Sequence, residues 1–242
     1  DERKWGFITE DGRFAINAQY ISATVFSEGL AWIISENSAP AAIDVKGELK
    51  FTLLNAEEVR VFKDGLAAFS SVNDEGEKKW GFVDKTGKVV VNPQFSQVSN
   101  FSNGKCGVSN ADGKWGFIDG EGKISVNYQF DDAGDFQNGK CVVTYSNKQG
   151  VIDENGKYII NPQFSKMKID GDLFLVRQED KWGWCDKEGH ITINPQFSKA
   201  FPFNGSEITS VRSGGKYGYI NKEGKFEINP QFDNALPFNG KL

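Results

Sequence analysis

The sequence holds few of the side chains on which most active sites and metal centres depend. Its 242 residues include one histidine, three cysteines and one methionine. A Ser/His/Asp or Cys/His catalytic site would have to use His190, whose surroundings are typical of an ordinary hairpin turn. The sequence has no Cys-x-x-Cys pair, and one histidine cannot complete the usual zinc ligand sets. We therefore expect a protein that is not an enzyme and has no catalytic residues, no metal site and no cofactor.

The sequence also lacks long apolar runs and blocks of charge of one sign. No apolar segment approaches the roughly 18 residues that indicate a membrane-spanning helix. The 28 basic and 33 acidic residues give a net charge of −5 and are interspersed along the chain. Nucleic-acid binding normally requires a basic patch, which this pattern does not provide. We expect no membrane insertion and no nucleic-acid partner.

A repeat dominates what the sequence does contain. The dipeptide Trp-Gly, or a derivative of it, recurs at positions 5, 40, 80, 115, 149, 182 and 217, at intervals of 33 to 40 residues. Two repeats are degenerate and have Pro40 and Gln149 at the Trp position. A near-constant period in this range is typical of solenoids, propellers and arrays. We place the repeat starts near residues 4, 39, 79, 114, 148, 181 and 216.

Two further blocks follow most of these positions in the same order, with milder variants of the first block at residues 17–20 and 127–130. Asn-Pro-Gln-Phe occupies residues 92–95, 161–164, 194–197 and 229–232, and Phe-x-x-Gly occupies residues 26–29, 62–65, 101–104 and 136–139. The second repeat departs most, because Thr52-Leu53-Leu54-Asn55 stands where Asn-Pro-Gln-Phe belongs. Its local geometry is therefore expected to differ from that of the other repeats.

Together these blocks resemble the WG-repeat family, also called KWG repeats, over nearly the whole chain. The resemblance implies a mostly bacterial protein of a family that varies in repeat number and has no general activity. It supplies no catalytic residues that could be carried onto this chain. The location stays open between the cytoplasm and the cell surface.

The alternation of apolar and polar residues inside the repeats predicts short strands. Three to four antiparallel strands per repeat would make a small twisted sheet, so we expect an all-β protein of about seven such sheets. The sheets must stack, and the first arrangement that we consider is β-propeller-like. The alternative is an open superhelical β array or solenoid. With no linker between repeats, residues 1–242 are expected to form a single domain.

The strand after each Phe-x-x-Gly turn has two different faces. One face is regularly apolar, as in Ala31 and Ile33, and is expected to be core. The opposite face varies from repeat to repeat and carries Trp32, so we expect it to be open to solvent or a ligand. For the Trp-Gly strand, our hypothesis is that the indole of one repeat packs over the Gly of a neighbouring repeat.

The turns and the cysteines have structural interpretations. Asp44, Asp84, Asp119, Asp153 and Asp186 each begin a turn and are expected to accept hydrogen bonds from its backbone. Cys106, Cys141 and Cys185 occupy apolar slots of the repeat and are interpreted as buried free thiols. A disulfide between Cys106 and Cys141 is the alternative.

The sequence favours a noncatalytic scaffold that recognises a protein or peptide partner. The alternative is a carbohydrate or cell-wall binding module, because Trp-rich and Gly-rich repeats also build glycan-binding surfaces. The candidate contact residues lie where the array is least regular. They are Trp32 and the extended hairpin of residues 71–79, with Asn73, Asp74, Glu75, Glu77 and Lys78.

Overall fold

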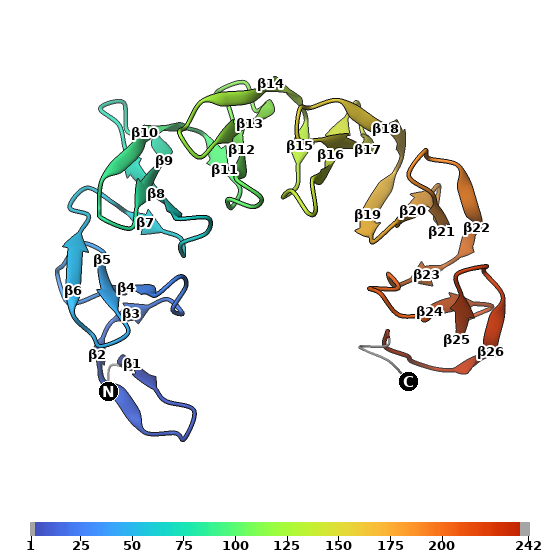
Figure 1. The fold of residues 1–242 in the computed structure, drawn as a ribbon, viewed down its shortest axis with the longest axis horizontal. Helices are drawn as coiled ribbons and strands as arrows, with labels where there is room; N and C mark the ends of the chain where they lie inside the picture. Colours follow the sequence, from blue (N-terminus) through green and yellow to red (C-terminus); the bar gives the residue numbers. More distant parts are fainter. Residues whose placement is uncertain (1–2, 238–242) are drawn as a thin grey trace. The chain divides into compact units, whose positions relative to one another are not determined.

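The computed structural model describes residues 3–237, which form 26 β-strands in seven antiparallel sheets (Figure 1). Six sheets have four strands and one, β1–β2, has two. The described residues include no helix, and so none that could cross a membrane. This confirms the prediction of an all-β protein made of about seven small antiparallel sheets. Both arrangements considered from the sequence, a β-propeller and an open array, are built from such sheets.

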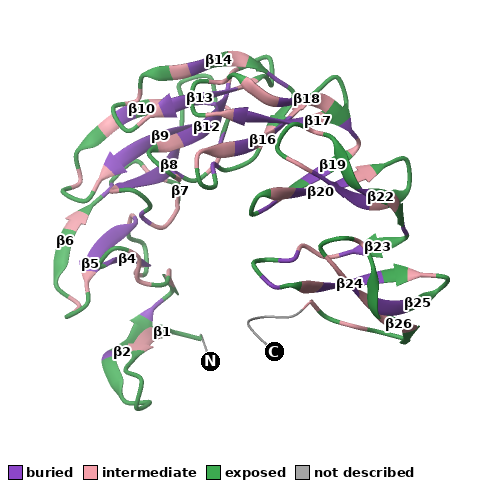
Figure 2. Ribbon diagram, turned by 45° about the vertical axis from the view of Figure 1, so that its right-hand side comes forward, coloured by how far each residue is buried: buried purple, intermediate pink, exposed green. Residues whose placement is uncertain are grey.

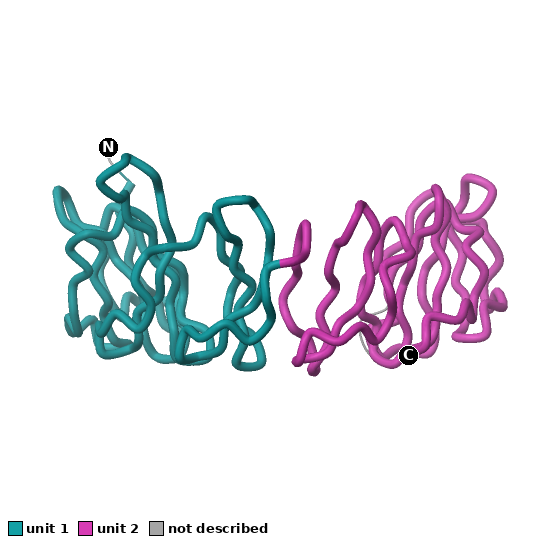
Figure 3. Tube along the Cα trace, turned by 90° about the horizontal axis from the view of Figure 1, so that it is seen from above, with its two compact units in different colours: residues 1–128 teal, residues 129–242 magenta. Residues whose placement is uncertain are grey.

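The chain divides into two compact units, residues 1–128 and 129–242 (Figure 3). The boundary falls inside strand β14, and the single domain expected for residues 1–242 stays a prediction. The strands that begin in the first unit are β1 Trp5–Ile8, β2 Phe14–Tyr20, β3 Ser22–Ala23, β4 Leu30–Ile34, β5 Ala41–Asp44, β6 Leu49–Thr52, β7 Glu58–Val59, β8 Leu66–Val72, β9 Lys78–Asp84, β10 Val89–Phe95, β11 Gln97–Val98, β12 Lys105–Ser109, β13 Trp115–Asp119 and β14 Ile124–Phe130.

The second unit repeats the same plan. Its strands are β15 Asp132–Ala133, β16 Lys140–Tyr145, β17 Lys148–Asp153, β18 Tyr158–Phe164, β19 Lys166–Asp170, β20 Leu173–Gln178, β21 Lys181–Cys185, β22 Ile191–Phe197, β23 Lys199–Ala200, β24 Ile208–Ser213, β25 Lys216–Asn221 and β26 Phe226–Phe232. In every four-stranded sheet the strands pair in chain order. The strand after the Phe-x-x-Gly turn is second, the Trp-Gly strand is third, and the Asn-Pro-Gln-Phe strand is an edge.

Within each unit, neighbouring sheets stack face to face, so the second and third strands are buried on both sides (Figure 2). In the first unit, Phe82 and Phe95 of one sheet pack with Val108 and Ile118 of the next. The expectation of an open variable face is therefore wrong. Trp32 on that face is 1% exposed, because the following sheet covers it.

The glycine of the Trp-Gly dipeptide is required by a backbone contact inside its own sheet. A Cβ atom on Gly81 would lie 2.7 Å from the backbone nitrogen of Pro93, which no side chain can tolerate. The register between β9 and β10 shifts here, since Trp80 pairs with Phe95 while Phe82 pairs with Val91. The Asn-Pro segment is thus a bulge that crosses over the glycine.

This geometry corrects the hypothesis that the indole packs over the Trp-Gly glycine of a neighbouring repeat. The side chain of Trp115 does lie beside a glycine, 3.5 Å from a Cβ placed on Gly107, but that glycine belongs to the adjacent strand of the same sheet. The glycine of the dipeptide, Gly116, faces the backbone of Val126 and Asn127 instead.

The turn aspartates behave as expected. The Oδ1 atom of Asp84 accepts hydrogen bonds from the backbone N–H groups of Thr86 and Lys88, at 2.8 and 3.0 Å. The other four aspartates each accept the same pair of bonds, and Gly87 takes a positive φ of 89° at the fourth position. These local hydrogen bonds account for the aspartate at this turn position, and no bound ligand is needed to explain it.

The three cysteines are buried free thiols, as the first interpretation expected. Burial raises the pKa of both Cys141 and Cys185 from 9.0 to about 12. Such thiols stay protonated and are poor nucleophiles.

Substitution of the Trp-Gly glycine tests the bulge contact. We expect Gly150→Ala to lower the free energy of unfolding by about 3 kcal/mol or more, because its Cβ would lie 2.5 Å from the carbonyl oxygen of Ile160. Gly120→Ala is the matched control. Its Cβ meets nothing within 4 Å, and a change within about 0.5 kcal/mol is expected. Equal losses for the two variants in urea unfolding would contradict the contact.

The thiols give a pH-dependent prediction. Their folded-state pKa lies above the unfolded value, so their contribution to stability is complete below pH 9.0 and is lost as the pH rises toward about 12. We expect the stability of the wild type to fall more steeply between pH about 8 and about 10.5 than that of the Cys141→Ala, Cys185→Ala double variant. Identical slopes in urea unfolding would show that folding does not raise the pKa of these thiols above the unfolded value.

Candidate functional site

A cleft of about 280 Å³ opens in the first unit between the sheets β3–β6 and β7–β10. It lies where the first strands of these sheets, β3 and β7, form sheet edges. Its walls combine hydroxyl, carboxylate, guanidinium and indole groups. They come from Ser22, Thr24, Trp32, Ile34, Glu57, Glu58, Val59, Arg60 and Trp80. The cleft therefore offers polar and charged groups around an aromatic base.

Trp32 forms the base of this cleft and is held rigidly. Its indole stacks on Phe62 at 5.5 Å between ring centroids, and the edge of Phe51 contacts it at the same distance. The indole Nε1–H donates a 2.9 Å hydrogen bond to the carbonyl oxygen of Arg60, 28 residues along the chain. Because the indole is covered and its donor is satisfied, Trp32 positions Arg60 and supports the cleft wall rather than presenting an open ring.

Arg60 and Lys78 both contact the indole of Trp80. The Arg60 guanidinium lies 4.5 Å from the ring centroid and donates a 2.8 Å hydrogen bond to the carbonyl oxygen of Val98. The Lys78 ammonium lies 5.3 Å from the same ring and 2.6 Å from the Glu58 carboxylate. Each of these cations is thus engaged within the protein.

Glu57 differs from the other charged groups of the cleft. Its backbone N–H donates to the carbonyl oxygen of Ser70, which fixes its position beside β7. The side chain is exposed, and within residues 3–237 no cation pairs with its carboxylate. Since Arg60, Lys78 and Glu58 engage one another or the backbone, Glu57 supplies the uncompensated charge of the cleft.

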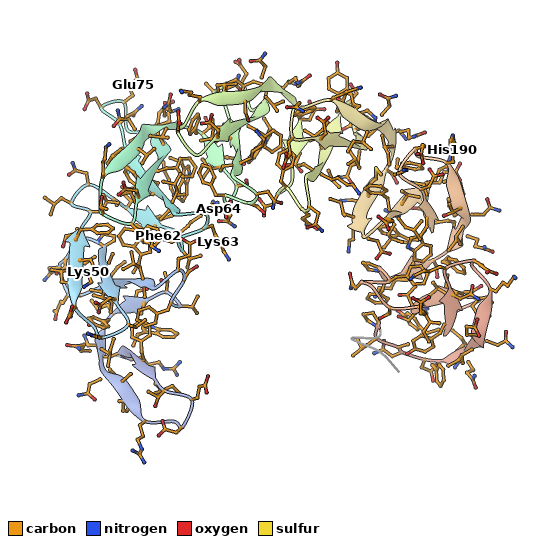
Figure 4. All side chains as sticks on the ribbon, in the orientation of Figure 1. Lys50, Phe62, Lys63, Asp64, Glu75 and His190 are labelled. Atoms are coloured by element: carbon orange, nitrogen blue, oxygen red, sulfur yellow. The ribbon has the colours of Figure 1, made fainter. Side chains whose placement is uncertain are left out.

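Only the base of the extended hairpin approaches the cleft, where Lys78 pairs with Glu58. Its turn, Asn73–Glu77, is closed by hydrogen bonds from Glu75 N–H and Glu77 N–H to the Asn73 side chain. Lys79 lies 3.0 Å from the Glu77 carboxylate, and this hydrogen bond holds the Glu77 pKa below its ordinary value. Asp74 and Glu75 are exposed at the tip, where Figure 4 shows Glu75 pointing away from the sheets.

The structure therefore brings together Trp32 and Lys78, both expected as contact residues, around Trp80 and Glu58. It does not bring Asn73, Asp74, Glu75 or Glu77 into the cleft wall. Sequence reasoning missed Glu57, Glu58 and Arg60. The available signal was the acidic pair Glu57-Glu58 in the slot that holds Ser96-Gln97 in the next repeat.

His190 lies in one of the regular turns. Its Nδ1 atom is 3.4 Å from Asp186 Oδ2, and Glu188 completes a group of three potential ligands, of which Glu188 and His190 are exposed and Asp186 is half-buried. The other oxygen of Asp186 already accepts the backbone N–H groups of Glu188 and His190. The cluster has the same local hydrogen bonding as the other turns and is explained by it.

Comparison with known proteins identifies the repeat. The family model described as WG containing repeat matches residues 5–37, 80–115, 115–148, 150–182, 182–217 and 217–242. The unmatched stretch, residues 38–79, holds the divergent second repeat. A search of curated proteins returns no match.

Solved structures show likeness at the level of fold. The computationally designed Ika8 protein matches with a TM-score of 0.50 and 10% identity, over 95% of this chain and 80% of that one. BamB from Moraxella catarrhalis matches with a TM-score of 0.44 and 12% identity, over 82% of this chain and 69% of that one. Six copies of the family model match most of the chain. The order of the motifs and the repeated four-stranded sheets agree with this match. The chain therefore belongs to the WG-repeat family.

Proposed function

We propose that this protein is a noncatalytic scaffold that binds a protein or peptide partner through the cleft between sheets β3–β6 and β7–β10. The observation that carries the proposal is the cleft itself, with the carboxylate of Glu57 beside two sheet edges. An extended peptide lies naturally along a sheet edge, where backbone groups supply affinity and side-chain pockets supply specificity.

The charge of the cleft indicates the chemistry of the ligand. Glu57 is unpaired in the described part of the chain, whereas Arg60 already contacts Trp80 and Val98. A Lys or Arg side chain of the partner would pair with Glu57. We therefore expect a partner segment that carries a basic residue.

The carbohydrate alternative is less well supported. Glycan-binding arrays need exposed aromatic rings that recur once per repeat, but the rings at the Trp-Gly positions differ widely in exposure. Trp80 and Tyr217 are 7% and 6% exposed, whereas Trp5 is 57% exposed. This pattern favours a single nonrepeating patch, which suits a protein or peptide partner.

A peptide selection tests the proposed ligand class. Short peptides selected from a random library for binding to the full chain should be enriched in Lys and Arg. We expect Glu57→Gln to weaken the selected peptides about tenfold, because a charge-assisted hydrogen bond is lost. Glu154→Gln, an exposed glutamate of the second unit, is the control and should leave affinity unchanged. Selected peptides without basic residues, or equal effects of the two variants, would contradict the proposal.

Shortening the extended hairpin tests whether its base belongs to the site. The hairpin exceeds that of the next repeat by two cross-strand pairs, Ser71 with Lys79 and Val72 with Lys78. Deleting these four residues leaves a turn with the same backbone hydrogen bonds as Asn110–Lys114, so folding should be retained. Affinity for a basic peptide should rise, because Glu58 loses Lys78 and becomes a second unpaired carboxylate in the cleft wall. Unchanged affinity in a folded variant would place the site elsewhere.

A further inference from the structure

Four asparagine–glycine pairs lie in exposed turns of residues 3–237, and a fifth, Asn239-Gly240, lies outside the described residues. An asparagine before glycine loses its side-chain amide most readily, because glycine has no Cβ to hinder ring closure. All four side chains are exposed, and within the described part of the chain none of their amide groups has a hydrogen-bond partner. The pairs are Asn103-Gly104, Asn138-Gly139, Asn155-Gly156 and Asn204-Gly205.

The loss of the amide begins at the backbone nitrogen of the glycine. This nitrogen gives its proton to hydroxide and attacks the asparagine Cγ atom. An N–Cγ bond forms, the side-chain nitrogen leaves as ammonia, and a cyclic succinimide results. Water then opens the ring at either carbonyl carbon, which leaves an aspartate or an isoaspartate. A glycine N–H that donates a hydrogen bond must first give it up, so that bond slows the attack. A carboxylate acceptor also opposes the negative charge that develops.

The turns at Asn103 and Asn138 have the same backbone structure. Both are two-residue hairpins, and in each the flanking residues exchange two backbone hydrogen bonds, of 2.9 and 3.2 Å at Asn103 and of 2.8 and 3.1 Å at Asn138. The two asparagines have φ values of 53° and 50°. A difference in reactivity between them must therefore come from the groups around each turn.

The glycine N–H groups of these two turns differ in their partners. Gly104 N–H donates a 2.8 Å hydrogen bond to the carboxylate of Asp64, which lies in the corresponding turn of the preceding repeat. Gly139 N–H has no acceptor among residues 3–237. Glu154 approaches this turn, with Oε1 3.7 Å from a Cβ placed on Gly139, but it does not accept the N–H. The first turn is thus protected, and the second is open to the reaction.

The other two pairs divide in the same way. Gly156 N–H donates a 3.0 Å hydrogen bond to the carbonyl oxygen of Asp153 within its own turn. In the last pair, the buried carboxylate of Asp170 accepts the backbone N–H of Asn204 at 2.9 Å. The N–H of Gly205 has no acceptor in the part of the chain that the structure describes.

We propose that Asn138 and Asn204 are sites of spontaneous deamidation in the folded protein, whereas Asn103 and Asn155 are protected. Water is the co-reactant, and ammonia is the leaving group. Each event replaces an exposed amide by a carboxylate, which is ionised at neutral pH. Where isoaspartate forms, the backbone of the turn gains a methylene group. The turn at Asn138 then no longer has the length of the two-residue hairpin that its hydrogen bonds close.

Peptide mapping by mass spectrometry measures all four rates in one sample. The full chain is incubated at mildly alkaline pH, and portions are digested in acid, which stops the reaction. We expect Asn138 and Asn204 to convert about tenfold faster than Asn103 and Asn155 in the folded chain. In guanidinium chloride the hydrogen bonds are lost, so the four rates should converge. Equal rates in the folded chain, faster conversion of the protected pair, or no conversion at Asn138 and Asn204 would overturn the proposal.

Removal of the Asp64 carboxylate tests the cause of the protection. Asp64 has a φ of 50°, so glycine can replace it without backbone strain. We expect Asp64→Gly to raise the rate at Asn103 about three- to tenfold and to leave the rate at Asn155 unchanged. Asp74→Gly, at the exposed tip of the extended hairpin in the same unit, is the matched control and should change neither rate. Circular dichroism checks the fold of both variants, and the wild-type comparison decides the proposal if either misfolds. An unchanged rate at Asn103 in folded Asp64→Gly would overturn protection by this hydrogen bond.

Discussion

The repeat depends on one close approach, in which the Asn-Pro backbone of the fourth strand crosses the glycine of the third. Repeat five keeps this contact at Gly150 although Gln149 replaces the tryptophan, so the glycine is the constant element. Repeat two supplies the natural comparison. Ala41 stands at the glycine position there, and the ladder from Ala41 with Thr52 to Ala42 with Phe51 runs without the shift seen elsewhere. Glycine and bulge are lost together, because the backbone can cross only where no side chain stands.

Sequence reasoning recovered what is local in this fold. The period, the strand alternation and the turn aspartates follow from contacts within a few residues, such as the hydrogen bonds to Asp84 from Thr86 and Lys88. It failed on what is nonlocal. The variable face of the second strand was expected to be open, yet it is buried, and its residues differ because each packs against different side chains of its own and the following sheet. Trp32 fits there since Phe51 and Phe62 surround it, while Gly107 fits since Trp115 fills its space.

The candidate site shows the same division between local features, which the sequence indicates, and nonlocal ones, which it does not. Irregularity in the second repeat led to Trp32 and the hairpin of residues 71–79; Trp32 lines the cleft, and Lys78 pairs with Glu58 of its wall. Their roles could not be read from the sequence, because the Nε1 bond of Trp32 goes to the carbonyl oxygen of Arg60 in the following sheet. Glu57 was missed because it lies just beyond the segment where the Asn-Pro-Gln-Phe motif is absent, and its correspondence to Ser96 of the next repeat was not used.

The cleft is an exception to the apolar stacking that joins neighbouring sheets within each unit. The stacking contact is strong because both faces of every inner sheet are buried, and a regular array therefore leaves little free apolar surface on its inner sheets. Repeat two departs from this regularity, because its β6 edge loses the bulge. The cleft around Glu57 lies at the edges formed by β3 and β7, where the wall is polar and charged. A polar cleft suits a distinct partner rather than another copy of the repeat.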